Sequence, residues 1–319
     1  MTWLLTGGAG YIGSHIARAL GQAGMDVVVL DDLSSGFREN VADGVPFVEA
    51  TLLDTAAVAR ALRDHDVTGV VHLAAKKAVG ESVEKPLMYW QQNVEGTRSL
   101  LEACTDVGVE RVLFSSSAAV YGTPDLDLVT EDAPPRPINP YGETKLIGEW
   151  MLRDLARATK IGWVSLRYFN VAGAGAPDLG DRGVFNLIPL VFRALSSGVP
   201  PQVFGADYPT PDGTCVRDYI HVVDLADAHV TAARALEAGP QAATYNVGRG
   251  EGASVKEVLD VVRAVTGRDF EAEVVDRRPG DPARLVAAVD AIERDLGWTA
   301  DRDLRDMVSS AWEAWQSRA

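Results

Sequence analysis

The chain has 319 residues, 47 % of them hydrophobic and 24 % charged, which suits one large α/β domain or two smaller ones. Its formal net charge of −15 argues against a broad nucleic-acid surface. Its two cysteines, Cys104 and Cys215, exclude a disulfide framework and fit a reducing compartment. We find no signal peptide and no apolar run near the ~18 residues of a membrane span, so we expect a soluble cytoplasmic enzyme.

Short apolar strands alternate with helices in the first half of the chain. Near-continuous apolar strands separated by helices predict a parallel sheet covered on both faces, with functional loops at the carboxyl ends of the strands. The strands that we expect span residues 3–5, 26–31, 46–49, 69–73 and 111–114, and the helices span 13–23, 56–63 and 93–107.

The second half of the chain has a mixed pattern. Glycine-, proline- and aspartate-rich stretches predict loops over 173–183 and 205–214. Between and after them we expect a helix over 187–196, a strand over 214–221, and helices over 223–236, 254–266 and 304–316. The predicted fold class is α/β, with a Rossmann-type doubly wound parallel sheet over 1–172 and a smaller C-terminal α/β domain over 173–319. The segment around 216–236 is expected to return to the first domain.

A glycine-rich turn follows the first strand. The run from Gly8 to Gly13 has the spacing GxGxxG, and Gly7 adds a GxxGxxG pattern. Such glycines allow a tight turn and close approach of the backbone to a pyrophosphate, which then lies at a helix N-terminus. The second strand ends at Asp31 at the expected distance, where a carboxylate can bind a ribose diol and repel a 2′-phosphate. We therefore predict NAD rather than NADP; the alternative is that Asp31 is only a turn residue.

A tyrosine and a lysine lie one helical turn apart, downstream of three serines. Tyr141 and Lys145 have i, i+4 spacing, which places them on one helix face. The ammonium group is expected to lower the pKa of the phenol, which otherwise is a poor base near neutral pH. Together with Ser115–Ser117 and the glycine turn, this pair predicts a nicotinamide-dependent active site acting on a carbinol carbon.

The order Ser117, Tyr141, Lys145 resembles the extended branch of the short-chain dehydrogenase/reductase superfamily. More closely, the chain is similar almost end to end to the UDP-glucose 4-epimerase family. The matching segments are 6–15, 77–82, 93–97, 115–117, 140–142, 167–170, 216–222 and 277–281.

The resemblance implies a function and roles for these residues. Tyr141 would be the base that takes the proton from the 4-hydroxyl of a UDP-hexose, with Lys145 supporting the phenolate and Ser117 hydrogen-bonding the 4-oxygen. The reaction would interconvert UDP-glucose and UDP-galactose through a transient 4-keto sugar, so NAD would stay bound between turnovers. The protein would supply position and electrostatics for the cofactor's chemistry.

The resemblance also implies binding residues, with NAD on 1–172, the UDP-sugar mainly on 173–319, and no metal. The expected NAD contacts are Gly7, Gly10, Tyr11, Ile12, Gly13, Asp31, Asp32, Thr51, Leu52, Leu73, Ala74, Ala75, Lys77, Asn93, Ser115, Tyr141, Lys145 and Tyr168. The expected UDP-sugar contacts are Lys77, Ser117, Tyr141, Asn170, Asn186, Leu187, Phe204, Arg217, Arg278 and Asp281.

Two positions depart from the family pattern. Thr51 stands where an aspartate usually contacts adenine, so NAD is expected to exchange more readily. Leu285 stands where the family limits the size of the sugar's 2-substituent; it is smaller than the tyrosine and larger than the cysteine found there in other members. Use of N-acetylated UDP-sugars is therefore an open alternative.

Other functions compete with this prediction. A 4,6-dehydratase needs an acidic pair after its catalytic Ser or Thr, and Ala118-Ala119 stands there instead. A UDP-glucuronate epimerase or decarboxylase, or a non-catalytic NAD-binding regulator, are further alternatives; the regulators typically lack the Tyr/Lys pair. The resemblance also implies a homodimer formed through helices near 93–107 and 141–159.

Overall fold

The computed structural model describes residues 1–278 and 280–317, and it divides into two compact units. Unit 1 contains Met1–Gly122, Pro135–Arg167 and Ala226–Tyr245; unit 2 contains Thr123–Pro134, Tyr168–Leu225 and Asn246–Ala319. Each unit is assembled from separate stretches of chain, and the boundary predicted at 172 stays a prediction. Within the described residues, no helix has the length and apolar character needed to cross a membrane.

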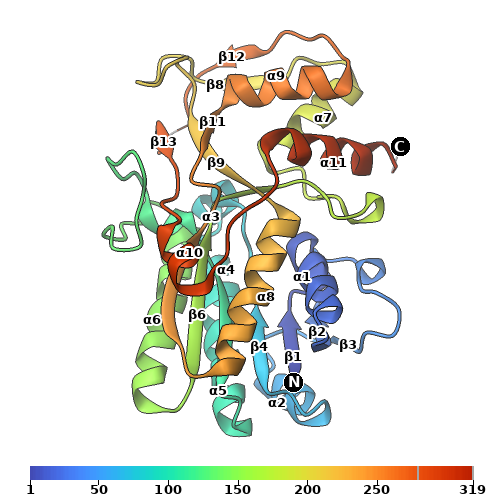
Figure 1. The fold of residues 1–319 in the computed structure, drawn as a ribbon, viewed down its shortest axis with the longest axis vertical. Coiled ribbons are helices and arrows are strands. Elements are labelled where there is room, and N and C mark those ends of the chain that lie inside the picture. The colour runs from blue at the N-terminus through green and yellow to red at the C-terminus, as the bar shows by residue number, and fades with distance from the viewer. Residues whose placement is uncertain (279, 318–319) are drawn as a thin grey trace. The chain divides into compact units, whose positions relative to one another are not determined.

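Unit 1 is organised by a seven-stranded sheet (Figure 1). Its strands lie in the order β10 (Ala242–Val247), β6 (Gly162–Tyr168), β5 (Arg111–Ser117), β4 (Gly69–His72), β1 (Thr2–Thr6), β2 (Asp26–Asp31) and β3 (Phe47–Glu49). The pairs β1–β2, β1–β4, β2–β3 and β4–β5 are all parallel. The chain proceeds from β1 to one side and returns at β4 to the other, so the predicted doubly wound Rossmann-type sheet is confirmed.

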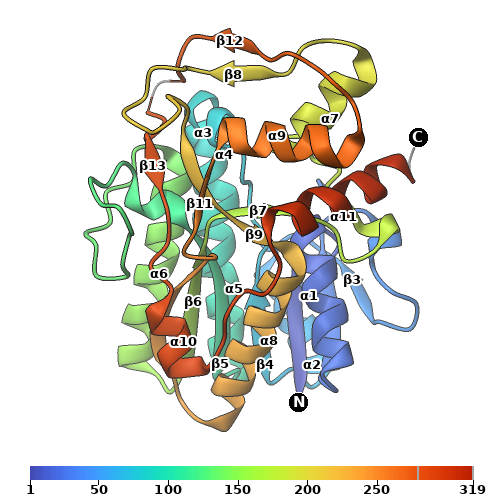
Figure 2. The ribbon, with the colours of Figure 1, turned by 45° about the horizontal axis from the view of Figure 1, so that its top comes forward.

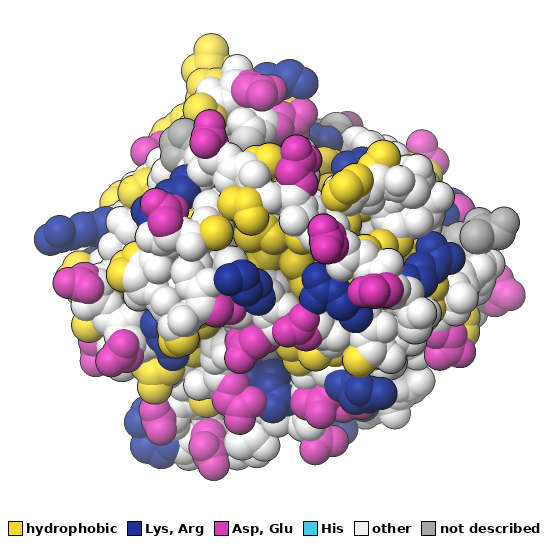
Figure 3. All heavy atoms as spheres, turned by 90° about the horizontal axis from the view of Figure 1, so that it is seen from above, with side chains coloured by type: hydrophobic (Ala, Val, Ile, Leu, Met, Phe, Trp, Pro, Cys, Tyr) yellow, Lys and Arg dark blue, Asp and Glu magenta, His cyan; other side chains and the backbone are white. Residues whose placement is uncertain are grey.

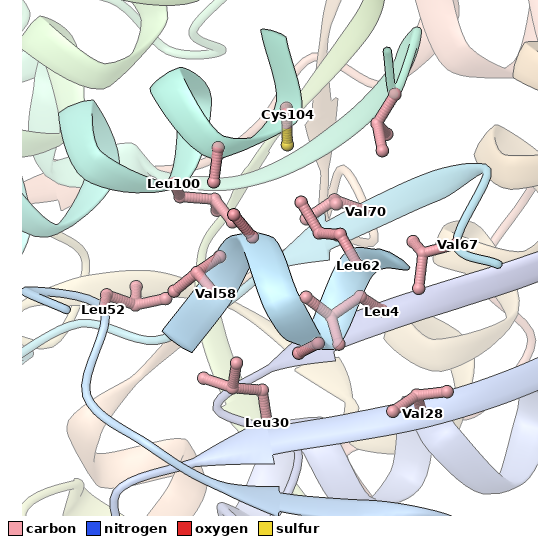
Figure 4. Packing of buried hydrophobic residues seen from close by; sticks show 14 residues of the cluster. Leu4, Val28, Leu30, Leu52, Val58, Leu62, Val67, Val70, Leu100 and Cys104 are labelled. Atoms are coloured by element: carbon pink, nitrogen blue, oxygen red, sulfur yellow. The ribbon is translucent and has the colours of Figure 1, made fainter. Parts of the chain in front are cut away.

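Helices cover both faces of this sheet. One face carries α2 (Thr55–Asp64), α5 (Gly96–Val107) and α6 (Pro140–Ala158). Leu62 of α2 and Leu100 of α5 pack with Leu4 of β1 and Val70 of β4 in one buried cluster, and none of these four side chains is exposed to solvent (Figure 4). On the other face, α1 (Tyr11–Gln22) and the part of α8 (Val222–Ala238) that starts at Ala226 lie side by side in both ribbon views (Figures 1 and 2).

Local signals explain where the helices of unit 1 begin and end. Asp54 and Asn139 cap α2 and α6 by accepting backbone N–H groups, and Pro140 occupies the first turn of α6. Gly108 ends α5 with a left-handed φ of 87°. The remaining short helical segments are η1 (Arg38–Asn40), α3 (Val79–Glu84), α4 (Pro86–Tyr89), the π-helical η2 (Trp90–Glu95) and η3 (Ala118–Tyr121).

Unit 2 is built around β9 (Val216–His221). This strand pairs in parallel with β7 (Asn170–Ala172) and β13 (Arg284–Leu285), and antiparallel with β11 (Gly252–Ser254). A separate parallel pair joins β8 (Gln202–Phe204) to β12 (Glu273–Val275). The helical segments are η4 (Pro177–Leu179), α7 (Leu187–Ser197), α9 (Val255–Thr266), α10 (Asp290–Leu296) and α11 (Leu304–Gln316). The face in Figure 3 mixes acidic, basic and hydrophobic side chains.

Several predicted elements differ from the observed ones. The helix predicted over 93–107 begins earlier, because Pro86 starts α4 and the chain continues through the π segment into α5. The strand predicted over 214–221 begins at Val216, because Thr214 instead donates its backbone N–H and hydroxyl to Asp212. The strand predicted over 111–114 continues to Ser117. The helix predicted over 304–316 has those bounds in the structure. The prediction omitted the strands β6, β7, β8, β10, β11, β12 and β13.

Candidate active site

The glycine turn between β1 and α1 leaves no room for side chains. A Cβ atom at Gly13 would lie 2.2 Å from the carbonyl oxygen of Gly7, and one at Gly7 would lie 2.8 Å from the backbone nitrogen of Ala74. Gly7 also has a left-handed φ of 73°. Among the described residues, no side chain caps the start of α1, which suits an anion at that helix N-terminus. The cradle therefore fits the pyrophosphate of NAD.

Asp31 lies beside this turn and helps to shape it. Its buried carboxylate accepts the backbone N–H of Ala9 at 3.0 Å and that of Leu33 at 2.9 Å. Burial raises the pKa of Asp31, and these two hydrogen bonds oppose the rise. Asp32 accepts the N–H of Ser34 at 2.9 Å. The observed role of Asp31 is thus to hold the backbone of the glycine turn. Its contact with the adenosine ribose of NAD stays a prediction.

The other predicted cofactor residues of unit 1 fall into two groups. Leu73–Ala75 follow β4, where the N–H groups of Leu73 and Ala74 donate to Thr6 and the run passes directly against Gly7. Asn93 bonds both backbone groups of Lys76 and the hydroxyl of Thr144. In contrast, Leu52 is part of the core cluster, Thr51 accepts the N–H of Leu53, and Lys77 is exposed. Tyr11 and Ile12 open α1.

The structure brings together Ser117, Tyr141 and Lys145. Ser117 ends β5, and a hydrogen bond from its side chain to the phenol of Tyr141 favours the ionised form. Lys145 Nζ donates to the carbonyl oxygen of Ser115 at 2.8 Å and lies 6.0 Å from the centre of the Tyr141 ring. Both Tyr141 and Lys145 are buried, as expected from neighbouring turns of one helix face.

Burial dominates the electrostatics of this pair. It raises the pKa of Tyr141, against which the hydrogen bond from Ser117 acts, and it lowers the pKa of Lys145 to about 8. The expectation that Lys145 brings the pKa of the phenol below its usual value is therefore wrong for the chain alone. The physical reason is that desolvation raises the pKa of Tyr141 more than the hydrogen bond from Ser117 lowers it, and lowers the pKa of Lys145 more than the charge of Glu149 raises it.

Unit 2 brings together several of the predicted sugar-nucleotide residues. Arg217 forms an ion pair with Asp281, at 2.6 Å between Nη2 and Oδ1. The guanidinium of Arg278 lies 3.7 Å from the centre of the Phe204 ring. Leu285 is the neighbour of Arg217 in the register of β13 and β9. A guanidinium beside an aromatic ring and another on a strand can bind a nucleotide diphosphate. Pro279 of the motif over 277–281 lies outside the described residues.

The remaining predicted residues of unit 2 are spread over other elements. Asn186 stands before α7 and donates to Asp181 at 3.3 Å, and Leu187 begins that helix. Tyr168 ends β6, and Asn170 begins β7. Asn186 and Leu187 therefore belong to a different element from Arg217, and their contact with a shared ligand stays a prediction.

Sequence reasoning missed two kinds of residue. Tyr219 is buried on β9 beside Asn170, to which it is hydrogen-bonded, and its pKa is raised by burial to about 12. The period of two along a strand, which places Arg217 and Tyr219 on one face, could have indicated it. Glu149 is buried two turns after Tyr141 and bonds to Arg167. The same helical spacing could have indicated Glu149, but its partner on β6 is not visible in a local pattern.

Comparisons with known proteins agree with this geometry. The family model described as "NAD dependent epimerase/dehydratase family" matches residues 3–248. The UDP-glucose 4-epimerase of Azospirillum brasilense is 47 % identical over 317 residues, covering 98 % of this chain and 91 % of that protein. The crystal structure of UDP-glucose 4-epimerase from Stenotrophomonas maltophila, with bound NAD and formylated UDP-arabinopyranose, is 41 % identical with a TM-score of 0.95 and covers 100 % and 99 % of the two chains. The UDP-Glc/GlcNAc 4-epimerase of Campylobacter jejuni is 37 % identical with a TM-score of 0.87 and covers 99 % of each chain.

Proposed function

We propose that this chain, which belongs to the NAD dependent epimerase/dehydratase family and within it to the UDP-glucose 4-epimerases, is an NAD-dependent isomerase that interconverts UDP-glucose and UDP-galactose. The observation that carries the proposal is the approach of Ser117, Tyr141 and Lys145 in the same unit as the glycine cradle. This arrangement offers a proton acceptor, a cation and a hydroxyl donor at one place. Unit 1 is the NAD-binding part of this proposal, and unit 2 contributes the UDP-sugar contacts.

The chain's own residues handle the proton and the position of the substrate. NAD, when bound, supplies the reversible redox chemistry at the sugar carbon. Tyr141 accepts the proton of the 4-hydroxyl when the sugar is oxidised, and it returns the proton to the 4-oxygen when the 4-keto sugar is reduced. Ser117 donates a hydrogen bond to the 4-oxygen of the sugar, from which Tyr141 takes the proton. Lys145 provides a positive charge that favours the phenolate form of Tyr141. Because the sugar carbon is oxidised and then reduced again within one turnover, the proposed reaction needs no net oxidant.

The diphosphate contacts in this proposal come from the arginines of unit 2. Arg217 is held by Asp281, and the ring of Phe204 lies against the guanidinium of Arg278. Both guanidinium groups are therefore partly ordered before a ligand arrives, which reduces the entropy lost on binding. Asn170, Asn186 and Leu187 complete the proposed sugar-nucleotide contacts.

Use of N-acetylated sugars is the second candidate activity. Leu285 pairs with Arg217 in the sheet register, which places it beside a proposed phosphate contact. A leucine is shorter than tyrosine, and the relative from Campylobacter jejuni is named as a 4-epimerase of both UDP-Glc and UDP-GlcNAc. We expect turnover of UDP-N-acetylgalactosamine to be slower than that of UDP-galactose.

We further propose a homodimer and a cytoplasmic location. The segment from α3 to η2 and the neighbouring α6 carry exposed large apolar residues, namely Val83, Leu87, Trp90 and Trp150. Leu87 is 82 % exposed in the monomer, and such a group of side chains suits a partner surface. Cys104 and Cys215 are both buried free thiols, in keeping with a reducing compartment. Sedimentation of the purified chain would test the dimer.

A coupled assay with UDP-galactose, run beside UDP-N-acetylgalactosamine, tests the proposed activity. We expect interconversion without net consumption of nicotinamide. Tyr141→Phe should lower kcat by about 10²–10⁴-fold, the usual contribution of a general acid or base, while NAD remains bound. Normal turnover by Tyr141→Phe would rule out the proposed proton acceptor, and inactivity of the wild type on both sugars would direct attention to uronic-acid nucleotide sugars.

A further inference from the structure

Glu149 continues the helix face that carries Tyr141 and Lys145. The three residues are spaced four apart along α6, so they lie on successive turns of one side. Glu149 is only 5 % exposed, and its carboxylate is held at both oxygens by Arg167 of β6. The bonds run from Nε to Oε1 at 2.9 Å and from Nη2 to Oε2 at 2.6 Å. A buried bidentate pair of this kind fixes the carboxylate in one orientation.

The same carboxylate also holds the end of β5. The hydroxyl of Ser116 donates to Glu149 Oε1 at 2.5 Å, while Lys145 Nζ donates to the carbonyl oxygen of Ser115 at 2.8 Å. Two successive turns of α6 thus bond to two successive residues of β5. The next residue of that strand is Ser117, which hydrogen-bonds Tyr141. The register between strand end and helix is therefore set immediately before the proposed catalytic serine.

Arg167 is itself anchored on its other side. Its Nη1 donates to the hydroxyl of Tyr121 at 2.9 Å, and its guanidinium lies 4.9 Å from the centre of that ring. A buried ion pair is weak evidence for stability, because desolvation of both charges offsets most of their attraction. What this arrangement does supply is a negative charge with a fixed position, one helical turn from the ammonium of Lys145.

We propose that Glu149 is a positioning residue for the Tyr141–Lys145 pair, acting through Ser116 and Arg167. The inference rests on the proposed function, since it assigns the pair a role in proton transfer. Glu149 opposes the burial that drives Lys145 toward its neutral form. Its loss would leave the positive charge of Arg167 unpaired and would remove the anion that keeps Lys145 charged.

Other ionisable groups lie near the ammonium of Lys145. His72 of β4 is fully buried with its pKa lowered to about 3, so it carries no charge near neutral pH. The hydroxyl of Ser115 is paired with His229 of α8 at 3.1 Å. Tyr141 and Glu149 on α6 and His72 on β4 interact with Lys145 itself. Tyr89 on α4 interacts with Tyr141, Arg167 on β6 is held by Glu149 and by Tyr121 of η3, and His229 on α8 is paired with Ser115.

The decisive experiment compares Glu149→Gln with Asp154→Asn. Asp154 lies on the same helix with its side chain 60 % exposed, so its variant removes one negative charge without touching the pair. We expect Glu149→Gln to move the alkaline limb of the kcat profile to lower pH by about one unit, because a neighbouring opposite charge shifts a pKa by about that amount or more. Asp154→Asn should keep the wild-type profile. Glu149→Asp, which retains the charge, should restore the limb but with a lower kcat.

A measurement independent of activity follows the charge on Lys145 directly. Melting temperature against pH is recorded for the wild type and for Glu149→Gln, each compared with the same chain carrying Lys145→Met. The melting difference is the melting temperature of the chain with Lys145 minus that of the same chain with Lys145→Met. In the wild type this difference should rise as pH increases above about 8, because above the pKa of folded Lys145 only the unfolded chain still binds the proton. In Glu149→Gln this rise should begin about one pH unit lower.

Two results would overturn the inference. One is a Glu149→Gln enzyme whose kcat profile coincides with that of Asp154→Asn and whose melting difference coincides with that of the wild type. The other applies if Glu149→Gln does not fold: Ser116→Ala keeps both charges, and an unchanged kcat in that variant contradicts the proposed path to β5. If wild-type activity is absent, the melting difference still decides the electrostatic part, so failure of the proposed function is distinguished from failure of this inference.

Discussion

The packing of Gly13 allows a quantitative test of the cofactor cradle. The replacement Gly13→Ala puts a Cβ atom 2.2 Å from the carbonyl oxygen of Gly7 and 2.7 Å from the Cα atom of Gly8. Ordinary contact begins at 3.4 Å, so the backbone of the turn must move by about 1.2 Å. Both obstructing atoms are backbone, so no side-chain rotation can relieve the contact.

The energy of this change is a difference between two terms. Overpacking a closely packed site costs about 1–3 kcal/mol. Alanine gains about 1 kcal/mol over glycine within a helix, and Gly13 lies inside α1. We expect a net destabilisation of up to about 2 kcal/mol, which lowers the melting temperature by up to about 3 °C in a chain of this size. The displaced turn should also weaken NAD binding about tenfold, the factor that corresponds to ~1.4 kcal/mol.

Gly21→Ala is the matched control in the same helix. A Cβ atom there meets no heavy atom within 4 Å, so the helix gains propensity without any clash. Differential scanning calorimetry and the NAD that remains after gel filtration are measured for both variants and the wild type. Gly21→Ala should melt slightly higher and retain NAD as the wild type does. A Gly13→Ala chain that melts and retains NAD like Gly21→Ala would refute the close packing described for the turn.

Three further predictions concern charge. Lys145→Met should abolish turnover, yet it should raise the free energy of unfolding near pH 7 by up to about 3 kcal/mol. This gain over the wild type should shrink as pH rises from about 8 to 10.5, because in that range the lysine of the folded wild type is neutral and only the unfolded chain holds its proton. Arg217→Lys, assayed by initial rates, should raise KM for UDP-galactose about tenfold with a smaller change in kcat, because lysine lacks the bidentate fork. Burial raises the pKa of Asp218 from 3.8 to about 6, so this group's contribution to stability should fall as pH rises from about 4 to 6. The difference in melting temperature between wild type and Asp218→Asn measures that fall, and an increase would contradict it.

The parts of the site that the sequence predicts are those formed by local spacing. The glycine turn lies within seven residues, and Tyr141 and Lys145 lie within one helical turn, so period and loop chemistry are sufficient to identify them. The apolar runs of β1, β2 and β4 likewise predict a buried parallel sheet. The roles assigned to individual cofactor and sugar contacts stay predictions, because they follow from the resemblance rather than from the spacing.

The parts that sequence reasoning missed depend on distant partners. β8 pairs with β12 across about 70 residues, and each strand has only three residues, too few for a period of two to be recognised. The π segment over Trp90–Glu95 has no local sequence signal of the kind that marks a cap or a turn. The ion pair of Arg217 with Asp281 spans 64 positions, so only the fold reveals that each residue has a partner.

The pKa of Tyr141 illustrates why composition of a motif does not determine its chemistry. Spacing alone suggests that Lys145 activates the phenol, but burial penalises the phenolate and the ammonium alike. The chain alone therefore holds Tyr141 as a neutral phenol at neutral pH, and a further favourable charge is needed before this residue can accept a proton. The positive ring of NAD, when bound, would supply such a charge, and in our proposal Glu149 keeps the other one on Lys145. Base strength then depends on an occupied cofactor site, which couples the proposed proton transfer to the cradle at Gly13.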